Sequence, residues 1–182
     1  MCEKTPADAL KDELFYSPEH AAFTCEDGEI ETADSFCGDY IDFLNRCKTE
    51  REVAAYVKTL AEENGFIPFD PDGSYEPGDK VYYDNRGKAL ILCVFGKQSL
   101  KSGAKIVASH IDSPRLDLKP NPLYEDTDLA LFKTHYYGGI KKYQWTAIPL
   151  SLHGVICRKD GTKVTVRLGE DEGDPQFVVT DL

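Results

Sequence analysis

Apolar residues recur at helical spacing over two consecutive segments in the first third of the chain. Between residues 34 and 47 they follow one another at steps of three and four, which predicts a helix with one apolar stripe. Thr49 and Glu52 then form a Thr-x-x-Glu capping box, and apolar positions continue on one face until Asn64 and Gly65 provide a stop signal. The pattern therefore predicts a second helix between the capping box and Asn64.

The next segments have the patterns of β-strands. Residues 80–83 and 89–95 are apolar runs separated by a turn-forming Asp-Asn-Arg-Gly stretch, which predicts an antiparallel hairpin. The second run is apolar on both faces, and with the strand-like stretch 105–109 it is expected in the middle of a sheet covered by helices on each side. The fold class that follows is α/β, a helix-flanked mixed sheet.

The pattern changes after Pro114. Apolar and charged side chains now alternate, which is typical of strands with one face in solvent, and no helix is expected in this half. The strand-like runs are 115–119, 129–136, 150–157, 162–168 and a short one opening at Phe177. The change predicts two structural units, residues 1–114 and residues 115–182.

Composition narrows the classes of partner. The 182 residues carry 32 acidic and 21 basic side chains, a formal net charge of −11, so nucleic acid and anionic membrane surfaces are disfavoured as principal partners. No apolar run approaches the ~20 residues that span a bilayer, and we expect a cytoplasmic protein. The six cysteines lack the spacing of a structural zinc site, which predicts reduced thiols. Because the chain stops in apolar, strand-like sequence, we expect it to be part of a longer polypeptide.

His110 and Asp112 are the strongest candidates for chemistry. They follow the apolar run 105–109 and precede Pro114. On an extended chain, side chains two residues apart point the same way, so the imidazole and the carboxylate are expected side by side. Such a pair suits a metal-bound histidine oriented by an acid, and it also suits a solvated loop histidine. The two residues alone leave both interpretations open.

The remaining candidates have simpler interpretations. His135 is interpreted as a surface strand residue, His153 as structural, and His20 as an exposed residue at a helix start. The stretch Gly138–Lys142 lacks the spacing of a phosphate-binding loop, so a tight turn explains it. No serine lies in a Gly-x-Ser-x-Gly motif, which leaves serine-hydrolase chemistry without support.

A series of motifs resembles one enzyme family. The segment Ala-Ser-His110-Ile-Asp112-Ser-Pro114 is followed by Leu-Asp-Leu-Lys-Pro120 and then by Tyr137-Gly-Gly-Ile. This order resembles the aspartyl aminopeptidase family of dinuclear zinc exopeptidases, in which His-Thr-Asp-Ser-Pro precedes Lys-Pro and a later Tyr-Gly-Gly. The resemblance extends over most of the chain.

The resemblance implies a fold and a set of site residues. Residues 1–114 would form the N-terminal part of the catalytic α/β domain, and residues 115–182 the start of an inserted β-rich dimerisation domain in a homo-oligomer built from dimers. His110 matches the family's first zinc ligand, and Asp112 matches the acid that orients it. The other ligands and the general-base glutamate lie downstream of the insertion in the family, and this chain contains none of those segments.

Two positions depart from the family pattern. Ile111 replaces the usual threonine, whose side chain should point away from the metal. After Gly139 the chain has Lys141-Lys142-Tyr-Gln-Trp-Thr where the family has Trp-His-Thr-Trp-Phe-Asp-Arg-Asp, so a histidine thought to reach the neighbouring subunit's active site is lysine or missing. The departure leaves both acidic and neutral N-terminal residues open as substrates.

The activity that the resemblance implies is removal of the N-terminal residue from a peptide. Two zinc ions would polarise the scissile carbonyl and lower the pKa of a bridging water toward ~7, while a glutamate moves the proton. We expect the 182-residue chain alone to be inactive. The alternative hypothesis is a non-catalytic, truncated paralogue that acts as an interaction or oligomerisation module.

Overall fold

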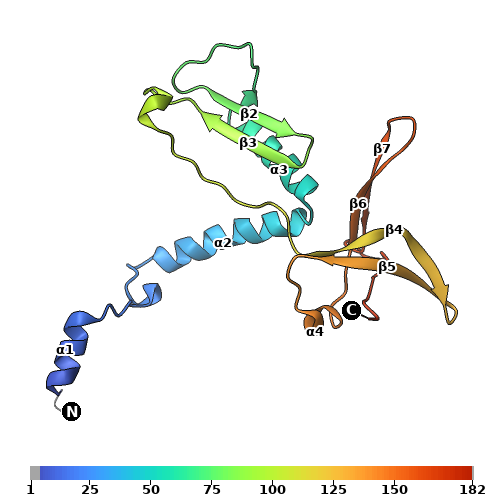
Figure 1. Cartoon of the computed structure of the whole chain (residues 1–182), viewed down its shortest axis with the longest axis horizontal. Helices are drawn as coiled ribbons and strands as arrows, with labels where there is room; N and C mark the ends of the chain where they lie inside the picture. The colour runs from blue at the N-terminus through green and yellow to red at the C-terminus, as the bar shows by residue number, and fades with distance from the viewer. Residues whose placement is uncertain (1–4, 182) are drawn as a thin grey trace. The chain divides into compact units, whose positions relative to one another are not determined.

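The structure, a computed structural model, describes residues 5–181 and divides the chain into two units, Met1–Asn45 and Arg46–Leu182. In chain order the elements are α1 (Pro6–Leu14), the 3-10 helix η1 (Ala21–Phe23), α2 (Glu29–Arg46), α3 (Glu50–Glu63), β1 (Ile67–Pro68), β2 (Lys80–Asn85), β3 (Ala89–Val94), the 3-10 helix η2 (Leu100–Ser102), β4 (Arg115–Asp126), β5 (Leu129–Tyr137), α4 (Lys142–Trp145), β6 (Leu152–Cys157) and β7 (Lys163–Leu168) (Figure 1). No helix within residues 5–181 combines the length and the apolar character needed to cross a membrane. The boundary predicted after Pro114 does not coincide with the division after Asn45, and it stays a prediction.

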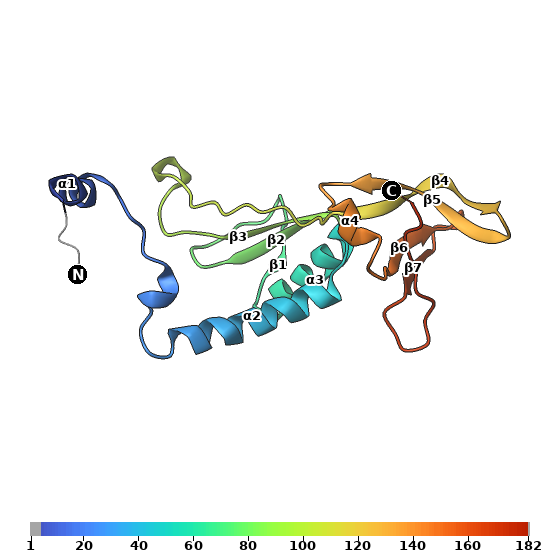
Figure 2. The same cartoon turned by 90° about the horizontal axis from the view of Figure 1, so that it is seen from below.

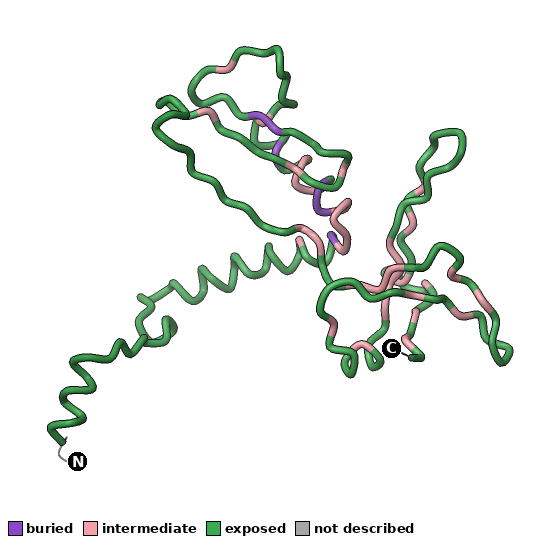
Figure 3. The backbone as a smooth tube through the Cα atoms, in the orientation of Figure 1, coloured by how far each residue is buried: buried purple, intermediate pink, exposed green. Residues whose placement is uncertain are grey.

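The first unit consists of exposed helices. α1 begins with a capping box, in which the Thr5 hydroxyl accepts a hydrogen bond from the Asp8 amide and the Asp8 carboxylate accepts one from the Thr5 amide. α2 contains the predicted apolar stripe but begins earlier than predicted, at Glu29. No residue from 5 to 45 is buried, and Figure 3 shows this part of the tube exposed along almost its whole length. These helices therefore form no core among themselves.

α3 is the helix that the capping box predicted. The Thr49 hydroxyl accepts a hydrogen bond from the Glu52 amide at 3.3 Å, and Glu52 Oε2 accepts one from the Thr49 amide at 2.9 Å. Asn64 ends the helix, and Gly65 follows with a φ of 82°, a left-handed conformation that favours glycine. Both signals predicted from the sequence are confirmed.

The core of the second unit lies around α3 and a three-stranded mixed sheet (Figure 2). β1 pairs with β2 in parallel, and β2 pairs with β3 in the predicted antiparallel hairpin. Arg86 and Gly87 in the connecting turn have φ values of 62° and 65°, and the Lys88 amide donates a hydrogen bond to the Asn85 carbonyl oxygen at 3.2 Å. α3 covers one face of the sheet, where the Tyr82 hydroxyl donates a hydrogen bond to Glu62 Oε1 at 2.6 Å. The buried apolar residues are Cys47, Val53, Ala54, Ala61, Val81 and Tyr82.

The strand predicted over residues 105–109 is not present. Residues 103–114 have no regular secondary structure, and Ile106 and Val107 are 85% and 100% exposed. The prediction was wrong because an apolar strand needs neighbours for its backbone hydrogen bonds and cover for its faces, and nothing among residues 5–181 pairs with this segment. The sheet is also covered by a helix on one face, where cover on both was expected.

Two hairpins follow in the β-rich half. β4 and β5 pair antiparallel with a register shift between Leu118 and Leu123, where two prolines lack the amide hydrogens that a ladder needs. β6 and β7 pair in the predicted hairpin without a shift. Phe177 forms one isolated bridge instead of opening a strand. The single turn α4 corrects the expectation of no helix here, because four residues are too few to show a helical period in the sequence.

His153 on β6 links the β6–β7 hairpin to α3. Its side chain is 5% exposed, with Nδ1 2.8 Å from Glu52 Oε1 and Nε2 3.1 Å from Glu170 Oε1. The Ser151 hydroxyl lies 3.0 Å from Nε2 and donates a hydrogen bond to Glu170 Oε1 at 2.8 Å. Because buried polar groups are costly without partners, this network fixes the hairpin against the first turn of the helix.

The network lowers the pKa of both carboxyl groups. Burial alone would raise the pKa of Glu52, but hydrogen bonds from His153 and the Lys48 amide outweigh it and hold the pKa below its ordinary value of 4.5. The Ser151 hydroxyl is the largest cause that lowers the pKa of Glu170, and His153 adds to it. A carboxyl with a depressed pKa stabilises the fold above its ordinary pKa, and the stabilisation is lost as the pH falls through the folded value.

We predict that His153→Leu lowers the free energy of unfolding at pH 7 by about 1–3 kcal/mol, because it takes one hydrogen-bond partner from each of the partly buried carboxylates Glu52 and Glu170. The difference from the original chain should shrink below pH 4.5, as both glutamates become protonated. Urea unfolding over a pH series measures this difference. His135→Leu, at an exposed position on β5, is the matched control. Equal losses for the two variants, or a His153→Leu loss that does not change with pH, would contradict the prediction.

Candidate functional site

The structure places His110 and Asp112 in the irregular segment that leads into β4. The His110 side chain is 83% exposed, and that of Asp112 is partly exposed. The two side chains lie side by side, as the sequence predicted, although the segment is not a strand. The pair is therefore formed by a local contact just before the first residue of β4.

The contact between the two residues sets the hydrogen position on the imidazole. His110 Nδ1 lies 2.8 Å from the Asp112 carbonyl oxygen and 3.2 Å from Asp112 Oδ1. Both oxygens are acceptors, so we assign the ring hydrogen to Nδ1 and the lone pair to Nε2. An exposed imidazole that donates through one nitrogen and leaves the other open is the form in which histidine binds a metal ion.

Tyr137, at the end of β5, holds the second oxygen of Asp112. The Tyr137 hydroxyl donates a hydrogen bond to Asp112 Oδ2 at 2.6 Å. This bond is the largest cause that lowers the pKa of the Asp112 carboxyl, and the same bond raises the pKa of the Tyr137 hydroxyl. Asp112 is therefore a carboxylate at neutral pH, with one oxygen toward His110 and the other toward Tyr137.

Arg115 stacks over the ring of Tyr137. The two residues are direct partners in the β4–β5 register, and the guanidinium carbon lies 4.1 Å from the ring centroid. Arg115 Nε donates a hydrogen bond to Asp117 Oδ1 at 2.7 Å, and Nη1 lies 3.9 Å from Glu50 Oε2 in the first turn of α3. The stack thus connects Tyr137 to the helix that holds the core.

Gly138 lets the end of β5 approach the candidate pair. Its φ is 74°, and a Cβ at this position would meet the Cα of Pro114 at 3.4 Å. The left-handed backbone therefore favours glycine here, while the distance to Pro114 is an ordinary van der Waals contact. The turn that the sequence indicated after Tyr137 therefore brings this tyrosine next to the Asp-Ser-Pro segment.

The other three histidines have different contacts. His20 accepts a hydrogen bond from the Ala22 amide at the start of η1, which agrees with its interpretation as an exposed residue at a helix start. His135 is an exposed strand residue, also as expected, and stacks on Tyr136. His153 is structural, as interpreted, but its carboxylate partners were not foreseen.

Sequence reasoning missed two members of the site, Arg115 and Tyr137. Their pairing depends on the register of two strands, and the shift caused by the prolines hides that register in the pattern. The Tyr-Gly-Gly motif was a signal for Tyr137, because its first glycine needs a special backbone conformation. No comparable signal marked Arg115.

His110 fits one position of a metal site. A zinc site uses three or four protein ligands, and no group of three or more His, Cys, Asp or Glu side chains is placed to hold a metal ion among residues 5–181. His110 has an accessible ring, a hydrogen-bonded Nδ1 and an open Nε2. Among residues 5–181, His110 is therefore a single side chain suited to a metal ion, with a carboxylate beside its second ring nitrogen.

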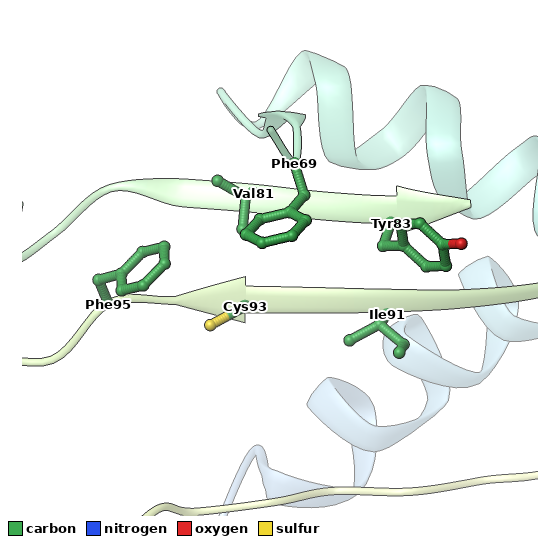
Figure 4. A pocket seen from close by; sticks show the side chains of 6 residues that line it. All are labelled: Phe69, Val81, Tyr83, Ile91, Cys93 and Phe95. Atoms are coloured by element: carbon green, nitrogen blue, oxygen red, sulfur yellow. The ribbon is translucent and has the colours of Figure 1, made fainter. Parts of the chain in front are cut away.

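An apolar hollow of about 380 Å³ lies on the sheet face that α3 does not cover. Figure 4 shows its lining side chains, which are Phe69, Val81, Tyr83, Ile91, Cys93 and Phe95. Tyr82 contacts α3, so Val81 and Tyr83 on either side of it point to the opposite face. The lining contains no charged side chain, so the hollow presents a mainly apolar surface, in which Tyr83 and Cys93 carry the titratable groups.

Comparisons with protein families, curated relatives and solved structures all match this chain to the same group of aminopeptidases. The family model described as "Aminopeptidase I zinc metalloprotease (M18)" matches residues 43–182. A probable M18 family aminopeptidase 1 of Clostridium acetobutylicum is 50% identical over 161 residues, which cover 86% of this chain and 35% of the relative. The crystal structure of aminopeptidase I from Borrelia burgdorferi B31 has a TM-score of 0.84 and 41% identity, covering 90% of this chain and 41% of that chain.

A more distant structure, the mApe1 dodecamer of S. cerevisiae, has a TM-score of 0.64 and 21% identity, covers 75% of this chain and 34% of that chain, and shows the fold alone. The chain spans about a third of the length of the curated relatives that it matches. These similarities confirm the predicted mixed helix-and-sheet fold and the predicted family. Because the family model matches residues 43–182, the chain belongs to the aminopeptidase I zinc metalloprotease (M18) family.

Proposed function

We propose that this chain is part of a zinc aminopeptidase that releases N-terminal residues, acidic or neutral, from peptides. The observation that supports the proposal most is the His110–Asp112 pair, in which Nδ1 is held by Asp112 and Nε2 is open. Membership of a zinc metalloprotease family gives the metal. The chain has Lys141 and Lys142 where the family pattern has a histidine. The proposal therefore includes neutral as well as acidic N-terminal residues as substrates.

In the proposed mechanism, this chain binds and orients. His110 would hold one of two zinc ions through Nε2, and Asp112 would keep the hydrogen on Nδ1 and make the ring a better ligand. The chemistry that zinc would supply at this site is polarisation of the scissile carbonyl and a lowered pKa, toward ~7, for a bound water. The remaining ligands and the general base would come from the two thirds of the relatives that this chain does not cover.

The proposed assembly is a homo-oligomer built from dimers, in a cytoplasmic protein. Residues 1–114 would belong to the catalytic domain, and residues 115–182 would begin the β-rich dimerisation domain. Strands β4 to β7 all lie in the second range, and Leu123 on β4 is 67% exposed. The yeast structure of the same fold is a dodecamer, and our proposal extends an oligomeric arrangement to this chain by analogy. Large exposed apolar side chains are typical of an interface.

A non-catalytic oligomerisation module is the second candidate function. It is favoured by the apolar hollow on the β2–β3 sheet and by the lack of a complete metal site among residues 5–181. In this alternative the chain binds a second copy of itself and has no hydrolytic role. Zinc-dependent hydrolysis separates the two candidates.

We predict that a chimera of this chain with the part of the Clostridium acetobutylicum relative that it does not cover hydrolyses an aminoacyl substrate, and that a chelator abolishes the activity. His110→Ala should lower kcat/KM by at least roughly 100-fold, and Asp112→Asn by about 10–100-fold, because a lost ligand costs more than a lost orienting group. Zinc content by mass spectrometry and steady-state kinetics measure both effects.

The control variant in the chimera is His20→Ala, which changes an exposed histidine outside the matched family region. It should keep the zinc content and the rate. If His110→Ala also keeps both, His110 is not a ligand. A folded chimera that binds no zinc and hydrolyses nothing would favour the oligomerisation module.

We also predict that the isolated chain self-associates and that Leu123→Glu shifts it toward the monomer, because the substitution places a charge on the exposed apolar surface of β4. Sedimentation velocity measures the distribution of species. Ile91→Glu, in the apolar hollow, is the matched variant on the other sheet. If Ile91→Glu dissociates the chain and Leu123→Glu does not, the assignment of dimerisation to residues 115–182 is wrong.

A further inference from the structure

We infer that Tyr137 is a positioning residue for His110, because it holds the Asp112 carboxylate, which together with the Asp112 carbonyl oxygen keeps the hydrogen on Nδ1 and leaves Nε2 open. The inference rests on the proposed function and deepens it. Tyr137 touches neither a metal ion nor a substrate in this account, and it acts only through Asp112. It would be an orienting residue that the β-rich half supplies to a ligand of the preceding segment.

The Asp112 carboxylate is held from two sides. Its two carboxylate oxygens have different partners, with Oδ2 accepting from the Tyr137 hydroxyl at 2.6 Å and Oδ1 lying 3.2 Å from His110 Nδ1. A partly exposed aspartate side chain has a more closely defined rotamer when both of its oxygens have partners. The shorter bond is the one from Tyr137, so the tyrosine determines the plane of the carboxylate and thus the direction of Oδ1.

Tyr137 is itself held in place by its neighbours. Tyr137 is paired with Arg115 in the strand register, and the guanidinium lies over its ring. Arg115 is in turn held by Asp117 at 2.7 Å and faces Glu50 at 3.9 Å. Its Nη1 is buried and has no hydrogen-bond partner among residues 5–181, so stacking and ion pairs hold the guanidinium in place. A ring clamped in this way directs its hydroxyl toward one place.

A purely structural role makes a different prediction from a positioning role. If the Tyr137 hydroxyl only ties β5 to the preceding segment, its removal lowers stability and leaves the imidazole unchanged. If the hydroxyl sets the carboxylate, its removal lets Asp112 rotate and weakens the preference of His110 for a hydrogen on Nδ1. The ratio of the two tautomers of His110 therefore distinguishes the roles without activity or metal.

The test is nitrogen-15 NMR of the imidazoles in the 182-residue chain, without metal and at a pH where histidine is neutral. The spectrum should show His110 mainly with its hydrogen on Nδ1, and His110→Gln identifies the signals. Tyr137→Phe keeps the ring beneath Arg115 and should shift the tautomer ratio toward the Nε2 form by roughly threefold, the effect of losing one modest hydrogen bond. Asp112→Asn should shift it further in the same direction.

Tyr136→Phe is the matched control, because it removes the hydroxyl of the neighbouring tyrosine, which makes no hydrogen bond to Asp112. It should leave the ratio unchanged. If Tyr137→Phe disturbs the β4–β5 amide signals, Arg115→Lys takes its place, since lysine loses the stack and leaves the Tyr137 hydroxyl. A ratio that stays constant in the folded variant while Asp112→Asn changes it would overturn the inference.

A second measurement on the same samples separates this inference from the proposed function. Zinc added to the original chain should perturb His110 Nε2 and leave the ring hydrogen on Nδ1. If zinc leaves His110 unperturbed while Tyr137→Phe still shifts the tautomers, the metal assignment fails and the positioning role stands. If zinc perturbs Nε2 while Tyr137→Phe leaves the ratio unchanged, the positioning role fails and the metal assignment stands.

Discussion

The packing of the β-rich half in the second unit depends on the acidic side chains in the first turn of α3. Glu52 accepts hydrogen bonds from the Lys48 and Thr49 amides, which begins the helix, and the same carboxylate holds His153 of the β6–β7 hairpin. Glu50, one residue into the helix, faces Arg115 at the start of β4. The N-terminus of α3 thus anchors the β4–β5 and β6–β7 hairpins. Its acidic residues also suit the positive end of the helix dipole.

This anchoring explains how an exposed histidine can be oriented. From Glu50 the contacts continue through Arg115 and Tyr137 to Asp112, and from Asp112 to His110. Each step toward the histidine is more exposed than the helix terminus where the series begins. A functional side chain keeps its geometry when its supporting residues belong to rigid elements. The segment before β4 is irregular, but its Asp112 accepts a hydrogen bond from Tyr137 on a strand, and Tyr137 is in turn stacked by Arg115, which faces α3.

Local signals made much of the fold predictable. The capping box and Gly65 mark both ends of α3, and the predicted turn between the two strands contains Arg86 and Gly87, both with positive φ. The spacing of His110 and Asp112 likewise predicts their contact, because it depends on two residues of separation alone.

Long-range pairing was not predictable in the same way. His153 and Glu52 are 101 residues apart, and Tyr137 and Asp112 are 25 apart, so no spacing rule connects them. The stretch 105–109 has the composition of a buried strand, yet a strand forms only where partners are available, and composition says nothing about partners. Local sequence patterns do not encode long-range partners, and for this reason they identified neither the orienting residues nor the absence of the strand.

The central claim is that His110 belongs to a zinc site completed by the part of the relatives that this chain does not cover. Anomalous scattering at the zinc edge, from crystals of the chimera grown with zinc, tests it most directly. The account predicts zinc bonded to Nε2 of His110, with Nδ1 still facing Asp112. Zinc bound in the chimera without His110, or through Nδ1 of His110, would contradict it.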